Sequence, residues 1–251
     1  MRIALQKIAD LQGDVDGYIA QQRQETRFAP KVAADIAQRL LSAGRAEEAL
    51  TALDAISDAR KGWIPHEWEQ TRADVLEALG RTEEAQAFRW TCFERSLAQD
   101  HLRAYLKRLP EFDDVEAEER ALNHTLGHPE MLRALGFLVT WPALETAAQL
   151  VLGRASELDG DHYEFLVPAA QALEGKYPLA ATVLRRAMID YVLNENKATR
   201  YRHAARHLLE CESQAGSIAD YGKFPTHEAY VSELKKTHSR KIAFWSLLKA
   251  N

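Results

Sequence analysis

Three side chains that can bind a transition metal recur at helical spacing near the C-terminal end of the sequence. His203, His207 and Cys211 follow one another at intervals of four residues, so a helix places them on one stripe. Imidazole nitrogens and a thiolate are ligands that Zn²⁺ prefers. The alternative is an ordinary stripe beside the buried face, in which Cys211 packs as a small hydrophobic residue. We expect the second arrangement, and therefore no bound cofactor, and keep the metal site as the alternative.

A second set of candidate residues is basic and could hold an anionic group of a partner. Its members are Arg185, Arg186, Arg202 and Arg206. Arg202 and Arg206 are four residues apart and share one helix face. Aromatic residues that follow, such as Tyr221, could stack on bases or on a peptide. The alternative is a solvated surface on which long basic side chains cover apolar area.

The charge of the chain is unevenly distributed. Residues 1–175 hold 19 Lys and Arg against 30 Asp and Glu, a net charge of −11, whereas residues 176–251 hold 13 against 7, a net charge of +6. Such an asymmetry can mark a surface for anionic partners, or it can simply keep both ends of a long protein soluble. Because acids are interspersed among the bases, nucleic acid is predicted only as the alternative partner.

Motifs of the common enzyme classes are missing from the sequence. It contains no GxSxG, no Walker-type glycine loop and no GxGxxG. Asp100–His101 and Asp161–His162 are adjacent pairs, which we expect at helix starts, where Asp is a good cap. The sequence therefore favours a binding protein over an enzyme without deciding between them.

The composition is that of a helix-rich folded protein. Of 251 residues, 46% are hydrophobic and 27% charged, and only 12 are Gly and 8 Pro, which excludes a disordered chain and a turn-rich β-sandwich. Two cysteines cannot make a disulfide scaffold. The N-terminus lacks the apolar core of a secretory signal, and no window approaches ~18 uninterrupted apolar residues. We therefore expect a cytoplasmic protein without membrane contact.

Helical hairpins are the clearest elements of the sequence. Residues 33–56 show apolar positions at helical spacing on both sides of Gly44, which can adopt the left-handed turn that ends a helix. The same pattern returns 36 residues later at Gly80 and again at Gly175. In each copy an alanine lies five residues after the glycine, where two closely crossing helices leave no room for a large side chain. These alanines are Ala49, Ala85 and Ala180.

These hairpins resemble the tetratricopeptide repeat (TPR), whose period is near 34 residues. Arg89 departs from the pattern at a position that is usually apolar, and 95 residues separate Gly80 from Gly175. The resemblance implies an all-α fold, a right-handed α-solenoid of degenerate TPR-like hairpins over residues 1–251. We expect clear hairpins over 1–100, degenerate hairpins over 101–160, a clear hairpin with a following helix over 161–215, and a loop with a C-terminal helix over 216–251.

Two stretches are more specific than a general TPR. Residues 5–20, together with 177–193 and 198–210, resemble a bacterial family of uncharacterised TPR-like proteins, related to arrays that follow a SWIM-type zinc-binding segment. The CxC…CxH spacing of that segment cannot be built from Cys92 and Cys211. The resemblance implies no known activity, and it leaves open that the chain corresponds to the C-terminal part of longer relatives.

These observations together predict a scaffold that binds a protein or peptide without catalysis. A stacked helical array forms a long groove, for which Arg185, Arg202 and Arg206 are candidate lining residues. Binding of nucleic acid or another anionic ligand by the basic C-terminal third is the alternative. The last helix is expected over 226–249, and its apolar residues either cap the array or form a dimer seam, so both a monomer and a homodimer remain open.

Overall fold

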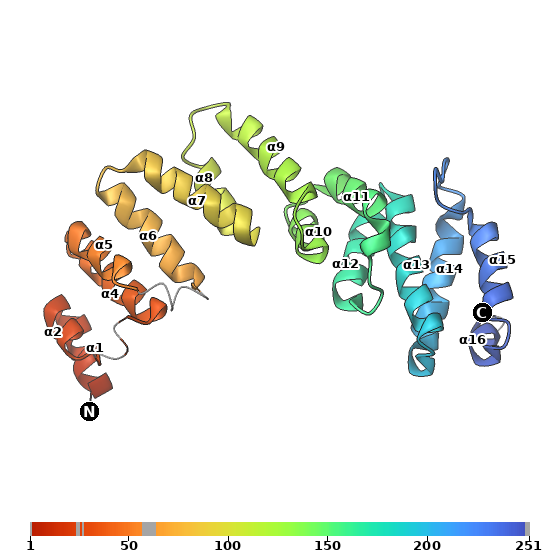
Figure 1. The fold of residues 1–251 in the computed structure, drawn as a ribbon, viewed down its shortest axis with the longest axis horizontal. Coiled ribbons are helices and arrows are strands. Elements are labelled where there is room, and N and C mark those ends of the chain that lie inside the picture. Colours follow the sequence, from red (N-terminus) through yellow and green to blue (C-terminus); the bar gives the residue numbers. More distant parts are fainter. Residues whose placement is uncertain (1, 24–25, 27, 57–63, 249–251) are drawn as a thin grey trace. The chain divides into compact units, whose positions relative to one another are not determined.

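All regular secondary structure in the described part of the chain is helical, which confirms the all-α prediction (Figure 1). The structure is a computed structural model that describes residues 2–23, 26, 28–56 and 64–248. The chain divides into two compact units, Met1–Ala117 and Glu118–Asn251, called unit 1 and unit 2 below. Within the described ranges, no helix is both long and apolar enough to cross a membrane.

Unit 1 is built from successive antiparallel helices. They are α1 (Arg2–Gln12), α2 (Val15–Ala20), α4 (Pro30–Ser42), α5 (Ala46–Asp54), α6 (His66–Ala78), α7 (Thr82–Ser96) and α8 (Gln99–Leu106), and α9 (Asp113–Leu126) continues into unit 2. Helix α4 packs on α5, α6 on α7, and α7 on α8. Gly44 lies in the turn between α4 and α5 with φ of +76°, and Gly80 lies in the turn between α6 and α7 with φ of +74°. Glycine adopts such values without a steric cost. The two helical hairpins predicted around these glycines are therefore present.

Small side chains lie where the helices of unit 1 cross. Ala49 and Ala85 are fully buried, as the repeated spacing predicts. Arg89, which departs from the repeat pattern, is buried as well, and its Nη1 donates to Oε1 of Glu77 at 2.8 Å. The guanidinium is tolerated at an apolar position because a carboxylate of α6 pairs with it.

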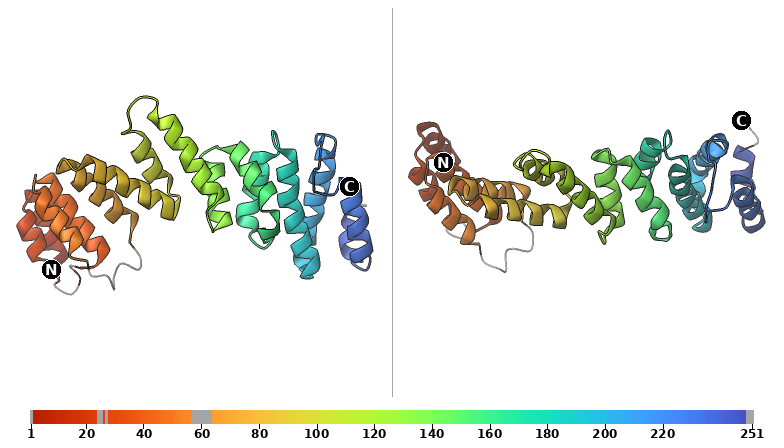
Figure 2. Two further views of the ribbon diagram at one scale, coloured as in Figure 1. Left: turned by 45° about the horizontal axis from the view of Figure 1, so that its top comes forward. Right: turned by 90° about the horizontal axis from the view of Figure 1, so that it is seen from above.

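Unit 2 contains the remaining helices, which are coloured from green to blue in Figure 2. They are α10 (Met131–Thr140), α11 (Leu144–Gly153), the short 3₁₀ helix η2 (Ala155–Glu157), α12 (Tyr163–Leu173), α13 (Pro178–Asn194), the 3₁₀ helix η3 (Ala198–Arg200), α14 (Tyr201–Ala215), α15 (His227–Thr237) and α16 (Ile242–Leu247). Between residues 101 and 160, where the sequence predicts degenerate hairpins, the structure has α9, α10, α11 and most of α8.

Helix α13 forms the centre of unit 2. Eleven of its 17 residues are buried, and it contacts α11, α12 and α14. A helix that is buried on nearly every side needs an apolar surface all round, which Leu184, Met188, Ile189 and Leu193 provide. The third hairpin of the sequence is the pair α12 and α13, and Ala180 at their crossing is fully buried.

The C-terminal segment differs from the single helix expected over 226–249. It forms two helices, α15 and α16, with a turn over residues 238–241. The indole Nε1 of Trp245 donates to the carbonyl of His238 at 2.9 Å and closes this turn. The turn lets Phe244 reach the core, where it is fully buried and its ring lies 5.9 Å from that of Tyr201. Helix α16 therefore packs back on α14.

Candidate functional site

A cavity of about 460 Å³ lies between α12, α13 and α14 in unit 2. Helix α13 contacts both α12 and α14, so it forms the floor and the other two helices form the walls. The apolar lining consists of Val167, Pro168, Met188, Val192 and Ala204. A concave apolar site of this volume is typical of pockets that bind a small molecule or an anchoring side chain.

Two backbone features give the cavity its shape. Gly160 lies directly on α13, because a Cβ at this position would come within 2.1 Å of the Ala187 carbonyl oxygen and 2.7 Å of Cβ of Tyr191. Pro168 interrupts the hydrogen bonding of α12 because it has no N–H. The carbonyl of Glu164, one turn earlier, therefore lacks its usual donor at position i+4. Gly160 and Pro168 both line the cavity.

The rim of the cavity carries basic side chains. Arg206 and His203 from α14 and Arg200 from η3 contribute to the lining, and the side chain of Arg206 is 58% exposed. Arg200 lies over the ring of Tyr163 at 5.0 Å and donates to Oδ1 of Asp161 at 2.6 Å. The hydrogen bond from Arg200 holds the pKa of Asp161 below its usual range. Arg206 is the other arginine of the lining, which also includes the acidic residue Glu164.

Glu210 gathers three of the predicted residues around one carboxylate. His207 Nδ1 lies 3.0 Å and Arg185 Nε 2.9 Å from its Oε2, and Arg206 Nε lies 3.5 Å from its Oε1. Burial would raise the pKa of Glu210, but hydrogen bonding to His207 and the charge of Arg185 outweigh it and lower this pKa. Burial lowers the pKa of His207 despite the carboxylate. This network fixes α14 against α13 behind the cavity.

The structure does not gather His203, His207 and Cys211 into one ligand set. Among the described residues, they do not form a group whose ligand atoms lie within 4.8 Å of one another. His203 is exposed at the cavity, whereas Cys211 is buried and its Sγ lies 4.0 Å from the carbonyl of Thr182. Burial raises the pKa of the Cys211 thiol to about 12, so the thiolate that a metal needs is disfavoured at neutral pH.

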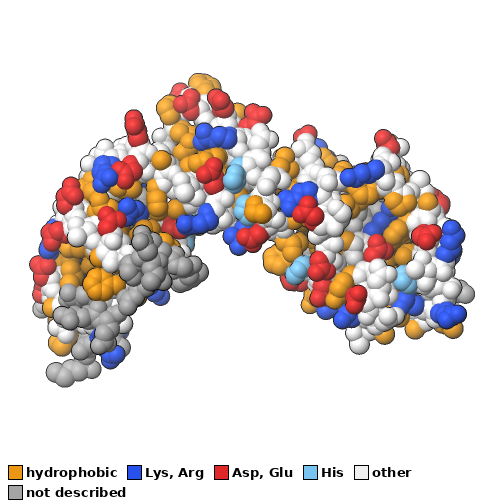
Figure 3. Space-filling model, viewed as in Figure 1, with side chains coloured by type: hydrophobic (Ala, Val, Ile, Leu, Met, Phe, Trp, Pro, Cys, Tyr) orange, Lys and Arg blue, Asp and Glu red, His pale blue; other side chains and the backbone are white. Residues whose placement is uncertain are grey.

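The four arginines predicted to bind an anion separate into two groups. Arg185 is buried and pairs with Glu174 and Glu210, and Arg186 is buried with Nη1 donating to the carbonyl of Pro225 at 2.7 Å. Arg202 and Arg206 are exposed, but Arg206 alone of the four lines the cavity. On the face of unit 2 seen in Figure 3, acidic and basic side chains are interspersed.

Most of the lining residues that the sequence did not single out come from α12 and α13. Val167, Pro168 and Met188 have no polar chemistry to mark them, and Tyr163 is an exposed aromatic, 51% accessible, at the start of a helix. A large apolar side chain on the exposed part of an otherwise periodic helix was the one available signal for this wall.

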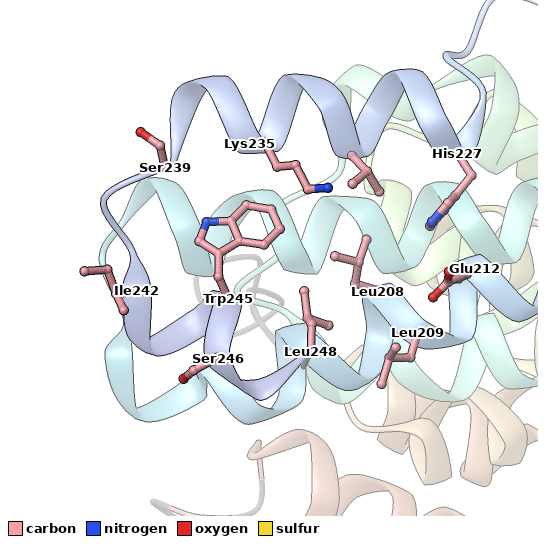
Figure 4. Close-up of a pocket in the computed structure, with 11 residues that line it drawn as sticks. Leu208, Leu209, Glu212, His227, Lys235, Ser239, Ile242, Trp245, Ser246 and Leu248 are labelled. Atoms are coloured by element: carbon pink, nitrogen blue, oxygen red, sulfur yellow. The ribbon is translucent and has the colours of Figure 1, made fainter. Parts of the chain in front are cut away.

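A second cavity, of about 650 Å³, lies between α14, α15 and α16. Leu208 of α14, together with Trp245 and Leu248 at the end of α16, converges on the space between the helices (Figure 4). Lys235 of α15 extends along this space. Leu248 on its rim is the last described residue, so the first cavity, whose rim is described throughout, is the better defined candidate site.

The comparison with protein families gives one result for this chain. A family model described as "Family of unknown function (DUF6880)" matches residues 1–247. Neither the curated proteins nor the solved structures gave a significant match.

Proposed function

The chain belongs to the family of unknown function DUF6880, and we propose that it is a helical-repeat module that binds a segment of a partner protein rather than an enzyme. The cavity between α12, α13 and α14 is the observation that carries this proposal. Three helix pairs with a buried alanine five residues after a glycine support the TPR-like character of the module, although only Gly44 and Gly80, and not Gly175, have a positive φ. TPR-like arrays present concave binding surfaces.

The chemistry of the cavity indicates the kind of segment that fits it. The apolar lining formed by Val167, Met188 and Val192 suits one aliphatic or aromatic side chain, whose burial supplies most of the affinity. Arg206 and His203 at the rim suit a carboxylate next to that side chain. We therefore propose a partner segment in which a large apolar residue is flanked by Asp or Glu.

Binding of nucleic acid by the basic C-terminal third is the competing proposal. Two of its arginines, Arg185 and Arg186, are buried in the core of unit 2, which leaves fewer cations for phosphates. Such binding would weaken steeply with salt because it releases counterions. A cavity that buries an apolar side chain would respond to salt much less.

A matched pair of charge reversals separates the two proposals. Arg202 and Arg206 are both exposed on α14, but only Arg206 lines the cavity. The probes are peptides selected from a phage-displayed random library and a fluorescent single-stranded oligonucleotide, each titrated by anisotropy. We expect the library to yield acidic peptides with an apolar anchor. Their Kd should rise at least ~10-fold, or 1.4 kcal/mol, in Arg206→Glu and stay unchanged in Arg202→Glu.

Two results would contradict the peptide proposal. One is a library selection that enriches no sequence on the wild-type protein. The other is an equal loss of affinity in both variants together with a steep salt dependence, which would transfer the proposal to a general anionic ligand of the basic surface. Circular dichroism of both variants controls for folding, and because both side chains are exposed we expect their spectra to match the wild type.

A further inference from the structure

Three potential metal ligands converge between α6 and α8 in unit 1. His66 and Glu69 are three residues apart at the start of α6, so they share one face of the helix. His101 lies in the first turn of α8. One ligand atom from each residue lies within 4.8 Å of the other two. No other group of three or more such residues was found in the described ranges.

The cluster is largely shielded from solvent. Glu69 and His101 are 5% and 4% exposed, whereas the side chain of His66 is 40% exposed. Two buried ligands and one at the edge are typical of a site that is fixed by the protein on one side and reachable by water on the other.

The short contacts within the cluster compete for one proton. Nε2 of His101 lies 2.7 Å from Oε2 of Glu69 and 3.2 Å from Nδ1 of His66. An imidazole nitrogen has a single in-plane position, which holds either a proton or a lone pair. If Nε2 of His101 carries a proton, that one hydrogen must serve two acceptors, Oε2 of Glu69 and Nδ1 of His66. If Nε2 carries no proton, its lone pair faces the lone pairs of the Glu69 carboxylate. A cation between the three atoms would use all of their lone pairs at once.

The separation of the two imidazole nitrogens fits a tetrahedral ion. With metal–nitrogen bonds of 2.0–2.1 Å, two tetrahedral ligands are about 3.3 Å apart, and the two nitrogens are 3.2 Å apart. The Glu69 oxygen is closer to Nε2 of His101, at 2.7 Å, and has to move away by about 0.6 Å to reach the ~3.3 Å separation of two tetrahedral ligands.

Neighbouring charges hold the ligands from outside. Asp100 Oδ2 lies 3.7 Å from Nε2 of His66, the ring nitrogen that points away from the cluster. A carboxylate behind a histidine is the usual outer partner in zinc sites, where it orients the ring. Arg95 pairs with Oε1 of Glu69, which leaves Oε2 for the contact with His101.

We infer that His66, Glu69 and His101 bind a transition-metal dication of the zinc class, with Asp100 as the outer partner of His66. Two nitrogens and one carboxylate oxygen suit Zn²⁺ and its neighbours in the series rather than Mg²⁺ or Ca²⁺. A fourth position, on the side of the partly exposed His66, is left for water or for a group of a ligand. The ion would also link α6 to α8.

Cobalt(II) is the probe that identifies this site in the intact protein. Protein treated with a chelator and then dialysed is titrated with Co²⁺ and followed by visible absorption, with Zn²⁺ as the competitor. We expect saturable binding of one ion per chain, visible d–d bands, and no charge-transfer band from a thiolate. A thiolate band would instead place the ion at a cysteine and overturn the assignment, because His66, Glu69 and His101 include none.

Variants test two of the three ligands and the outer partner of His66. We expect His101→Ala and Glu69→Gln to abolish saturable Co²⁺ binding, and Asp100→Asn to weaken it about 10–100-fold. His203→Ala, at the other candidate metal stripe, is the control and should bind as the wild type does. Retention of full affinity in His101→Ala, or no saturable binding by the wild type, would overturn the inference.

The Asp100→Asn variant tests the site even if the substitutions at the buried residues His101 and Glu69 prevent folding. Asp100 has a side chain that is 78% exposed, so Asp100→Asn is expected to fold even if His101→Ala and Glu69→Gln do not. Unchanged affinity in Asp100→Asn, combined with an unchanged cobalt spectrum, would then remove the site. Because the cluster lies in unit 1 and the peptide cavity in unit 2, the two proposals fail independently.

Discussion

Side chains of the same type have opposite roles on α13 and α14. Arg185 is buried, with Nε donating to Glu210 at 2.9 Å and Nη1 to Gln214 at 3.0 Å, and it also pairs with Glu174 at the end of α12. Arg202 is exposed. Since both are arginines in a basic stretch, only their positions relative to neighbouring helices distinguish an ion pair that joins helices from a solvated charge.

Replacing each arginine by alanine is expected to expose this difference. Arg185→Ala should lower the free energy of unfolding by about 1–3 kcal/mol, because it leaves the carboxylates of Glu174 and Glu210 without their common partner. Arg202→Ala should change it by less than ~0.5 kcal/mol. Urea denaturation followed by circular dichroism measures both, and equal effects would show that the Arg185 network does not stabilise unit 2.

We expect His227 to make the C-terminal region sensitive to acid. It is buried at the start of α15, its Nδ1 has no hydrogen-bond partner among the described residues, and burial, followed by the charge of Arg186, lowers its pKa. Glu212 and Glu228, which face it, oppose this shift. The folded state therefore prefers the neutral imidazole.

The sign of the pH effect follows from the lowered pKa. The stability that neutral His227 confers is complete above the ordinary pKa of 6.5 and is lost as the pH falls below it, because the unfolded chain binds the proton more readily. We expect His227→Gln to reduce the loss of thermal stability between pH 7 and pH 5.5, two values that lie on either side of the pKa of an unshifted histidine. An identical loss in wild type and variant would assign the acid sensitivity to other groups.

At the scale of elements, close backbone contact determines how the helices of unit 2 pack. The loop before α12 lies on α13 at Gly160, where even one methyl group would meet the Ala187 carbonyl. In α10, by contrast, a Cβ at Gly136 would meet nothing within 4 Å. Packing against α13 thus requires a glycine at position 160, whereas packing does not require one at position 136.

Alanine substitutions at these glycines should have opposite signs. Gly160→Ala is expected to destabilise the protein by about 1–3 kcal/mol, because the loop must move away from α13. Gly136→Ala should stabilise it by about 0.5–1 kcal/mol, because alanine restricts the unfolded chain and favours a helix interior. Thermal denaturation of both variants is the measurement, and a neutral Gly160→Ala would show that the loop is free to shift.

At the scale of the whole molecule, the chain consists of two compact units, each with its own buried core. The boundary falls within α9, so a cut just before Asp113 keeps that helix intact. The candidate metal cluster belongs to the first fragment and the cavity to the second. Each unit is larger than ~40 residues, the size below which a domain usually needs disulfides, metals or oligomerisation to be stable.

The two fragments 1–112 and 113–251 are expected to fold separately. Each should show a helical circular dichroism spectrum and a cooperative thermal transition. The first should retain saturable Co²⁺ binding and the second the affinity for selected peptides. A fragment that is unfolded alone but recovers helicity when the other is added would show that the two units depend on each other for stability.

The sequence alone determined the local elements of this protein. The apolar periodicity and the glycines at positions 44 and 80 predicted the helix pairs and their turns, because helix formation and left-handed turns depend on residues that are near in the chain. The small residues Ala49, Ala85 and Ala180, each five residues after a glycine, predicted the positions where paired helices cross. The break between α15 and α16 was not predicted: residues 235–241 contain no apolar residue, but no Gly or Pro marks the turn.

Only the tertiary structure decided which side chains meet. The regular spacing of His203, His207 and Cys211 does not gather their ligand atoms, whereas His66 and His101, 35 residues apart, come into contact. Contacts between helices depend on how each helix is rotated about its axis, which the packing of many distant residues sets together. The Glu69–His101 contact, the burial of Arg185 and the cavity between α12 and α14 all arise at that level, which periodicity within one helix does not encode.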